Sequence, residues 1–176
     1  MAIRQVLRIG NPLLRQVSLP VRTFNSDELH SLITDMRETM VAADGAGLAA
    51  PQVGVARRVM IFGITNNPRY PDAEPVPETI LINPEFEVLG ESIETGWEGC
   101  LSVPGMRGRV TRPAHIRYKG FDLQGNSIVC EAIGFHARVF QHEYDHLDGI
   151  LYVDRLDDPI HFGFVDELYA DEQLNN

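Results

Sequence analysis

Two histidines stand four residues apart in the segment Gln141-His142-Glu143-Tyr144-Asp145-His146. Residues four apart on a helix lie one above the other on the same face, so both imidazoles can reach one metal ion. Glu143, directly after the first histidine, can reach a water at that ion. The pattern therefore predicts a helix that carries a hydrolytic metal site. The alternative is a solvated, charged helix with two ordinary histidines, and the rest of the chain has to decide between them.

A helix is predicted around this motif, over about residues 135–147, with Gly149 ending it. Four of its residues recur at helical spacing and share a face: Phe135, Val139, His142 and His146. Because two of the four are apolar, that face should look into the protein interior and not into solvent.

The composition is that of an ordinary globular protein, with 44% hydrophobic and 23% charged residues. A length of 176 residues predicts one domain with its own core, so residues 1–176 are interpreted as a single catalytic domain. We expect no membrane partner, because no apolar run reaches about 18 residues and no secretion signal is evident. Two cysteines do not suggest a disulfide framework, which favours a cytoplasmic location. The net charge of −10 argues against binding of a specific nucleic acid by the surface as a whole.

Another helix is predicted over residues 25–43, with Asn25 as its N-cap and Glu28 completing a capping box. Five residues recur three or four apart and give it one buried face: Leu29, Leu32, Ile33, Met36 and Met40. Strands are predicted at 58–64, 79–89, 92–98, 115–121 and 127–133, with Pro84 marking an edge or a bulge. Residues 66–77 are predicted to form a loop.

Two more segments can contribute to a site. Residues 45–52 hold two glycines and three alanines, so their bare backbone allows another chain or a ligand to come close. Gln52, after a proline, can aim its amide at a developing oxyanion. Cys100 stands between a glycine and a strand-like Leu-Ser-Val. Taken alone, a tight turn and a small buried hydrophobe remain the ordinary interpretations of these segments.

The third metal ligand is open at this point. The metzincin spacing places Tyr152 where a histidine is required, so that pattern fails. Glu167 lies at a spacing close to that of the thermolysin-like third ligand, although in a tail that looks peripheral. A metallopeptidase with Glu167 as third ligand is therefore one alternative. A metal-binding module without catalysis is another.

Three segments together resemble one family, peptide deformylase, in order and at its usual separations: residues 45–52, residues 98–102 and residues 141–146. The resemblance runs from about residue 6 to residue 154. The Gly96-Trp97 pair and the loop at 66–77 are similar to those of a bacterial class I form. Three linked motifs are far more specific than one.

The resemblance implies that Cys100, His142 and His146 bind one divalent metal ion per chain, with water in the fourth position. Iron(II) would be the native ion, and zinc, nickel or cobalt can replace it. Glu143 would take a proton from the attacking water and pass it to the leaving amine. Gln52 and the backbone N–H of Leu101 would hold the oxyanion. The reaction would remove the N-formyl group from N-terminal formyl-methionine and release formate.

The substrate implied is the extended N-terminus of an N-formyl-methionyl peptide, which can pair with the bare segment as an added strand. The resemblance places Ala46 and Gly47 at the edge of the substrate site. It places Gly96, Phe135 and Val139, beside His142, around the methionine pocket. The stem of Arg138 is expected to pack on this wall with its head turned outward. Glu98 and Arg107 match positions that support the metal loop, as an ion pair.

The fold expected is α+β. Antiparallel β-sheets wrap around a central metal-binding helix, with an N-terminal helix packed outside and a short C-terminal helix. The tail over residues 154–176 carries seven acidic residues against one arginine. In some relatives a basic C-terminal helix docks on the ribosome, whereas ribosomal RNA would repel this tail. Ribosome contact through the tail is therefore not expected, and transient contact through another surface is left open.

Overall fold

The computed structural model describes residues 2–64 and 74–168. An N-terminal arm with a 3-10 turn at Pro12–Arg15 leads into helix α1, Asp27–Ala42. The predicted loop at 66–77 falls largely outside the described residues, and its last two positions already belong to a strand.

Helix α1 begins one residue later than predicted from the capping box. Ser26 is the N-cap, and its hydroxyl accepts a hydrogen bond from the Leu29 N–H at 3.3 Å. Asn25 has a φ of 53°, in the left-handed region, so it forms the turn before the helix and was wrongly predicted to be the cap. The predicted apolar face is confirmed, because all five of its residues are buried: Leu29, Leu32, Ile33, Met36 and Met40.

Five strands form an antiparallel sheet in the order β1-β2-β3-β6-β7. Their bounds are Gly47–Ala49 for β1, Val59–Ile64 for β2, Val76–Val88 for β3, His115–Phe121 for β6 and Ser127–Ile133 for β7. The register between β3 and β6 shifts between Ile82 and Glu85, so the bulge predicted from Pro84 is confirmed. Strand β1, built from the bare segment, lies at one edge of this sheet.

A second sheet has three antiparallel strands: β4 (Ile93–Cys100), β5 (Val103–Pro113) and β8 (Phe162–Phe164). Strand β5 was not predicted. Its sequence includes two prolines, two glycines and three arginines, which hide the alternation of a strand. The alternation exists nonetheless, since Gly108, Val110 and Arg112 are buried on the inner face.

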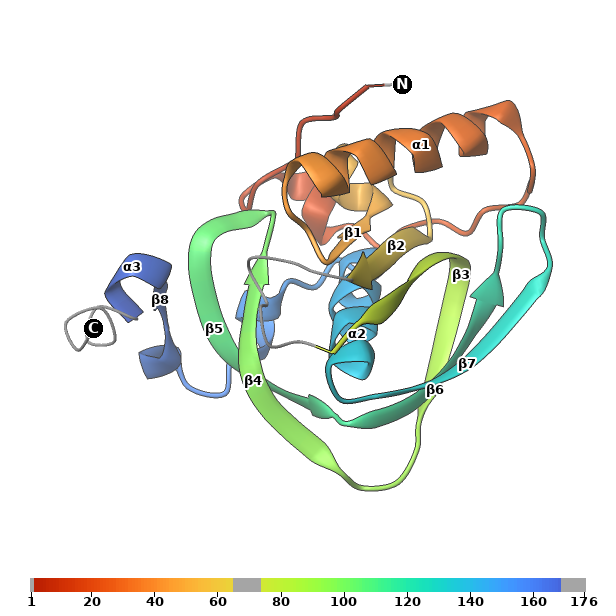
Figure 1. The fold of residues 1–176 in the computed structure, drawn as a ribbon. Helices are drawn as coiled ribbons and strands as arrows, with labels where there is room; N and C mark the ends of the chain where they lie inside the picture. The colour runs from red at the N-terminus through yellow and green to blue at the C-terminus, as the bar shows by residue number, and fades with distance from the viewer. Residues whose placement is uncertain (1, 65–73, 169–176) are drawn as a thin grey trace.

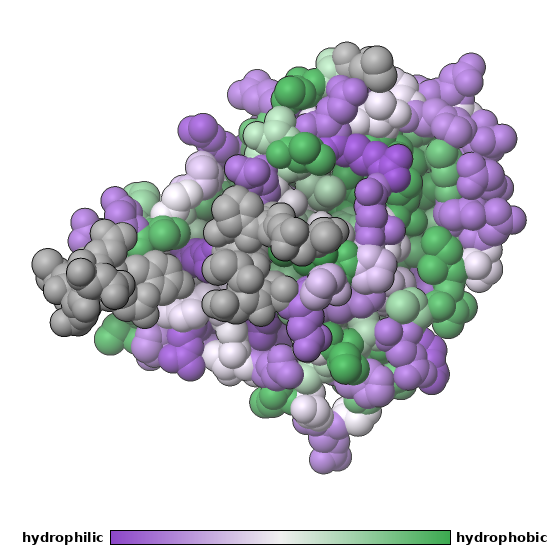
Figure 2. Space-filling view, in the orientation of Figure 1, coloured by the Kyte–Doolittle hydropathy of each residue, from purple (hydrophilic) through white to green (hydrophobic). Residues whose placement is uncertain are grey.

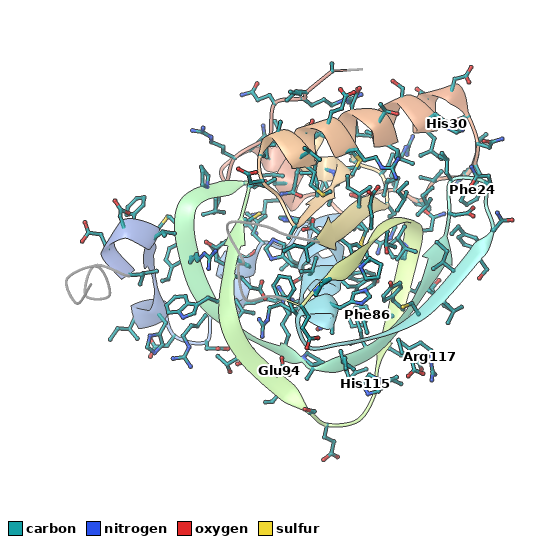
Figure 3. The ribbon with its side chains drawn as sticks, viewed as in Figure 1. Phe24, His30, Phe86, Glu94, His115 and Arg117 are labelled. Carbon is teal, nitrogen blue, oxygen red and sulfur yellow. The ribbon has the colours of Figure 1, made fainter. Side chains whose placement is uncertain are left out.

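Helix α2, Gly134–Leu147, runs through the middle of the molecule and both sheets curve around it (Figure 1). Phe140 of α2 stacks on Tyr118 with ring centroids 4.6 Å apart and meets Phe62 edge-on. Phe86 of β3 lies against the same helix, 5.0 Å from the ring of Tyr144 (Figure 3). Helix α1 covers β1 and β2 from outside. The predicted α+β architecture, with antiparallel sheets around a central helix, is confirmed.

The C-terminal part reaches the β5 edge of the second sheet through 3-10 turns at Tyr152–Arg155 and Pro159–His161. After β8 it ends in the short helix α3, Val165–Leu168, which packs against β5. Hydrophilic side chains cover much of the molecular face in Figure 2. Within residues 2–64 and 74–168, no helix is long and apolar enough to cross a membrane.

Candidate metal centre

Cys100, His142 and His146 come together in the interior. One potential ligand atom from each lies within 4.8 Å of the others, and all three residues are buried. The two histidines face the same side of α2, and their rings meet edge-on with centroids 5.1 Å apart. Cys100 ends β4, where its Sγ lies 3.2 Å from Nε2 of His146. The helix and the second sheet thus each contribute to one cluster of donors.

Polar donors surround the sulfur of Cys100. The Ser102 backbone N–H lies 3.4 Å from Sγ, and the Gln52 amide nitrogen lies 3.5 Å from it. Burial alone would raise the pKa of the Cys100 thiol, but His146 and His142 hold it well below its ordinary value. The sulfur is therefore favoured as thiolate, which is the form that binds metal.

Glu98 fixes the orientation of His142. Nδ1 of His142 donates to Oε2 of Glu98 at 2.9 Å, so Nε2 is the ring nitrogen left to bind a metal ion. Burial opposes the charge on Glu98, yet the hydrogen bonds from Arg112 and His142 hold its pKa far below the usual range. Burial lowers the pKa of His142, but its contacts with Cys100 and Glu98 outweigh this effect and raise that pKa well above its usual value.

A chain of buried charges continues behind Glu98. Arg112 binds both carboxylate oxygens, at 2.6 and 2.9 Å, and its third nitrogen reaches Asp145 at 2.8 Å. Asp145 also accepts two bonds from Arg155, at 2.6 and 2.7 Å. The ion pair predicted for Glu98 with Arg107 was therefore wrong, because Arg112 and Arg138 take this place.

These partners were missed in the sequence. Asp145 lies inside the histidine motif, between Glu143 and His146, where it was not assigned a role. Arg112 gave one usable signal, since it alternates with Val110 and Ala114 on an inward strand face. An arginine in such a position needs a buried acidic partner.

Glu143 lies beside the cluster with its carboxylate in a cavity. Burial raises the pKa of Glu143 to about 7, although His142 and His146 act in the opposite direction. Its Oε2 is buried and has no hydrogen-bond partner among the described residues. A buried carboxylate that can take up a proton near neutral pH is suited to act as a general base and then as an acid.

Gly47 on β1 supports this carboxylate directly. A Cβ at position 47 would collide with the carboxylate and with Cγ of Glu143. The segment predicted to be the edge that binds substrate therefore also leaves the space that the Glu143 side chain occupies. Because the glutamate is enclosed, the collision could be relieved only by moving its reactive oxygens.

We expect Gly47→Ala to lower kcat/KM by about 100-fold, the usual consequence of a 1 Å misplacement of a reacting group. Metal content should stay at the level of the unsubstituted protein, because the atoms nearest to the added Cβ belong to Glu143, which lies outside the donor group. Gly163→Ala on β8 is the matched control, since the φ of Gly163 is not left-handed and an added Cβ would make only ordinary contact with Leu168, at 3.4 Å. Full activity of Gly47→Ala would contradict the close packing of Glu143 on β1.

Gln52 is also held in place. Its Oε1 accepts the Ala49 N–H at 2.8 Å, so its NH₂ group points at Cys100 and Ser102. A cavity of about 40 Å³ opens beside these groups. Its walls include most of the predicted site residues: Ala46, Gly47, Gln52, Cys100, Leu101, Phe135, Val139, His142 and Glu143.

Gly96 and Arg138 lie differently from their predicted places at the methionine pocket. The described residues lining the cavity do not include Gly96, whose open side faces the guanidinium of Arg138. Arg138 lines the cavity and is buried, with only 8% of its surface exposed. The expectation that its head turns outward was wrong. His146, the remaining predicted ligand, is not among the described residues that line the cavity and is 1% exposed.

The donor set suits a transition metal. One thiolate and two imidazoles favour ions such as zinc, iron(II) or cobalt over magnesium or calcium, which prefer oxygen. The fourth side of the cluster faces the cavity with Glu143, as a catalytic site requires. Glu167 is exposed on α3 at the periphery and does not belong to this donor group, so the metallopeptidase alternative is not supported.

Comparison with known proteins agrees with this arrangement. A family model described as polypeptide deformylase matches residues 3–160. Peptide deformylase 1 of Nitrosomonas europaea is 52% identical over 172 residues, which cover 98% of each chain. Peptide deformylase 2 of Ralstonia nicotianae is 54% identical over 169 residues, which cover 96% of each chain.

Solved structures give the same result. A class I type b peptide deformylase from Acinetobacter baumannii, with K4U bound, superposes with a TM-score of 0.85 at 40% identity, covering 88% of this chain and 99% of the other. The Met-Ala-Ser-bound form of that protein gives 0.84 at 40% identity, covering 88% and 98%. The peptide deformylase of Thermotoga maritima gives 0.78 at 36% identity, covering 89% and 99%.

Proposed function

Since this chain belongs to the polypeptide deformylase family, we propose that Cys100, His142 and His146 hold one divalent metal ion at its catalytic site. The chain is a hydrolase that removes the N-formyl group from the N-terminal formyl-methionine of newly made polypeptides. The observation that carries the site assignment is the convergence of the three ligand atoms within 4.8 Å beside a buried, unpaired oxygen of Glu143.

The residues divide the work of amide hydrolysis between them. When bound, the metal supplies a Lewis acid that makes water at the site more acidic. Glu143 accepts a proton from the attacking water at its unpaired oxygen and delivers it to the leaving amine nitrogen. The NH₂ group of Gln52 and the backbone N–H of Leu101 donate to the oxyanion of the tetrahedral intermediate. Ala49 holds Gln52 in the required direction throughout.

The peptide would bind along β1. This strand is at the edge of its sheet, and Ala46 and Gly47 carry no side chain large enough to block an added strand. Main-chain pairing makes little distinction between sequences, which suits an enzyme that acts on many different chains. A Met-Ala-Ser complex of the Acinetobacter relative supports a peptide of this kind as ligand.

The methionine side chain would occupy the cavity between β1 and α2. This cavity has a volume of about 40 Å³. Phe135 and Val139 give it apolar walls, and methionine adapts well to such irregular space. Gly96 contributes by leaving room for the wall formed by Arg138.

The donor set of one thiolate and two imidazoles can bind several divalent transition-metal ions. We propose iron(II) as the native ion, because a thiolate with two imidazoles binds it and the family resemblance implies it. Zinc, nickel and cobalt fit the same donors. We further propose that residues 1–176 act as one catalytic domain in the cytoplasm, where translation supplies the substrate. Ribosome contact, if it occurs, would use a surface other than the acidic tail.

The test is formate release from a short formyl-methionyl peptide by protein purified without oxygen and loaded with iron(II). We expect rapid release that is absent with the same peptide lacking the formyl group. The number of metal ions per chain is measured on the same sample. If one ion is bound and no formate appears, the proposed site does not perform this reaction.

A further inference from the structure

Arg138 lies one helical turn before His142 on α2, with its guanidinium enclosed between this helix and the second sheet. It donates from Nη1 to Oε1 of Glu98 at 2.8 Å and to the Val110 carbonyl at 2.9 Å. Its Nη2 donates to the carbonyl of Glu94 at 2.6 Å, near the outer end of β4 (Figure 3). The side chain thus ties α2 to both β4 and β5 by charge-assisted hydrogen bonds.

Gly96 makes the room for this arrangement. An added Cβ at this position would lie 3.1 Å from Cζ of Arg138 and 3.2 Å from two of its nitrogens. Its φ does not lie in the left-handed region, so space and not backbone conformation requires a glycine here. Gly96 and Arg138 are therefore complementary positions, 42 residues apart in sequence but in contact across the helix–sheet interface.

Glu98 has two guanidinium partners, and Arg138 is one of them. Its other guanidinium partner, Arg112, is shared with a second buried carboxylate, Asp145. Asp145 also binds Arg155, so the two buried carboxylates are paired with three arginines: Arg112, Arg138 and Arg155. Arg138 pairs with Glu98 and not with Asp145, and this pair is enclosed, with the side chain of Arg138 9% exposed and that of Glu98 3% exposed. Removing either partner would leave the other charge buried with one partner fewer, which is costly.

The two arginines also restrict how Glu98 can turn. Oε1 accepts from Arg112 Nε and from Arg138, while Oε2 accepts from Arg112 Nη2 and from His142. Without Arg138, Oε1 would lose one of two donors and the carboxylate could follow Arg112 toward Asp145. The hydrogen bond that orients the His142 ring would then weaken.

We propose that Arg138 is a positioning residue for His142, which it orients through Glu98, and that Gly96 is the position that admits it. This inference rests on the proposed metal site. A purely structural role, in which Arg138 only fastens α2 to the second sheet, is the competing explanation. The two explanations differ in whether metal binding changes.

Arg138→Met separates them, because methionine keeps an apolar stem at the cavity wall and removes every hydrogen bond of the guanidinium. We expect zinc affinity, measured by competition with a chelator, to fall about tenfold, as when partners behind a metal ligand are lost. The visible spectrum of the cobalt(II)-loaded chain, which reports ligand geometry, should shift. Arg138→Lys, which restores the charge without the planar fork, should recover part of the affinity.

Arg117→Met is the matched control, since Arg117 of β6 has acidic partners only on the exposed surface, Glu87 and Glu131. It should bind zinc like the unsubstituted chain. If Arg138→Met has unchanged zinc affinity and an unchanged cobalt spectrum while its melting temperature falls, Arg138 is only a structural clamp and the proposal is wrong.

Gly96→Ala keeps the inference testable if Arg138→Met does not fold. The added methyl group pushes the guanidinium away without removing it, so zinc affinity should fall in the same direction by a smaller factor. Unchanged affinity in Gly96→Ala and Arg138→Lys would overturn the proposal. Failure of the unsubstituted chain to bind one metal ion would instead overturn the proposed site itself.

Discussion

Glu143→Gln should lose about 10⁴-fold in kcat for formate release while still binding one metal ion per chain. Glutamine has the same shape as glutamate but cannot accept the proton of the attacking water, and general acid–base catalysis contributes up to about 10⁴-fold. Metal binding should persist, because the donor group is formed by Cys100, His142 and His146 without Glu143. Full turnover in this variant, or in Glu143→Ala, would contradict the mechanism.

The stability of Glu143→Gln distinguishes a catalytic loss from unfolding. Burial raises the pKa of Glu143 from its ordinary 4.5 to about 7, so the folded chain binds this proton more tightly than the unfolded chain does. Stability therefore decreases as pH rises between these two values, and the cost is fully present above pH 7. Glutamine has no proton to lose, so at pH 8 the variant should melt no lower than the unsubstituted chain. Glu91→Gln, at an exposed turn, serves as the control for both measurements.

The parts of the site that depend on local spacing could be predicted from the sequence. His142 and His146 are brought together by the geometry of a single helix, and the apolar residues on the same face predict that it points inward. Cys100 and Gln52 could not be placed in this way, because nothing in their own segments fixes a partner. The family resemblance predicted them, and the structure brings both to the same cluster.

The supporting charges depend on tertiary register, which the sequence does not display. Glu94 lies opposite Arg112 in the β4–β5 ladder, while Glu98 lies opposite Gly108, yet the long arginine side chain reaches back to Glu98. Arg107 was predicted as the partner of Glu98 from the family resemblance, which did not display this register. The guanidinium of Arg138 likewise points inward because Gly96, across the interface between helix and sheet, has no side chain to occupy that space.

Cys100→Ala is expected to abolish metal retention and formate release together. Its sulfur is the ligand contributed by the sheet, and it is held by donors from Ser102 and Gln52 that alanine cannot use. Two imidazoles alone bind a divalent ion far more weakly than the full set, so affinity should fall by more than the roughly 100-fold that loss of a supporting partner causes. Metal content after gel filtration and competition with a chelator both measure this.

Two substitutions make the result specific to Cys100. Cys130→Ala removes the other free cysteine, a half-buried residue of β7 outside the donor group, and should leave metal content unchanged. Glu167→Ala removes the alternative third ligand that the thermolysin-like spacing predicts. Because Glu167 is exposed on α3, this substitution should also leave metal content unchanged. The opposite pattern, with metal kept by Cys100→Ala and lost from Glu167→Ala, would require α3 to fold back over the histidines. That arrangement would separate β8 from β5, which pair at Met106–Phe164, Arg107–Gly163 and Gly108–Phe162. The metal measurement therefore tests the ligand set and the packing of the C-terminal segment at the same time.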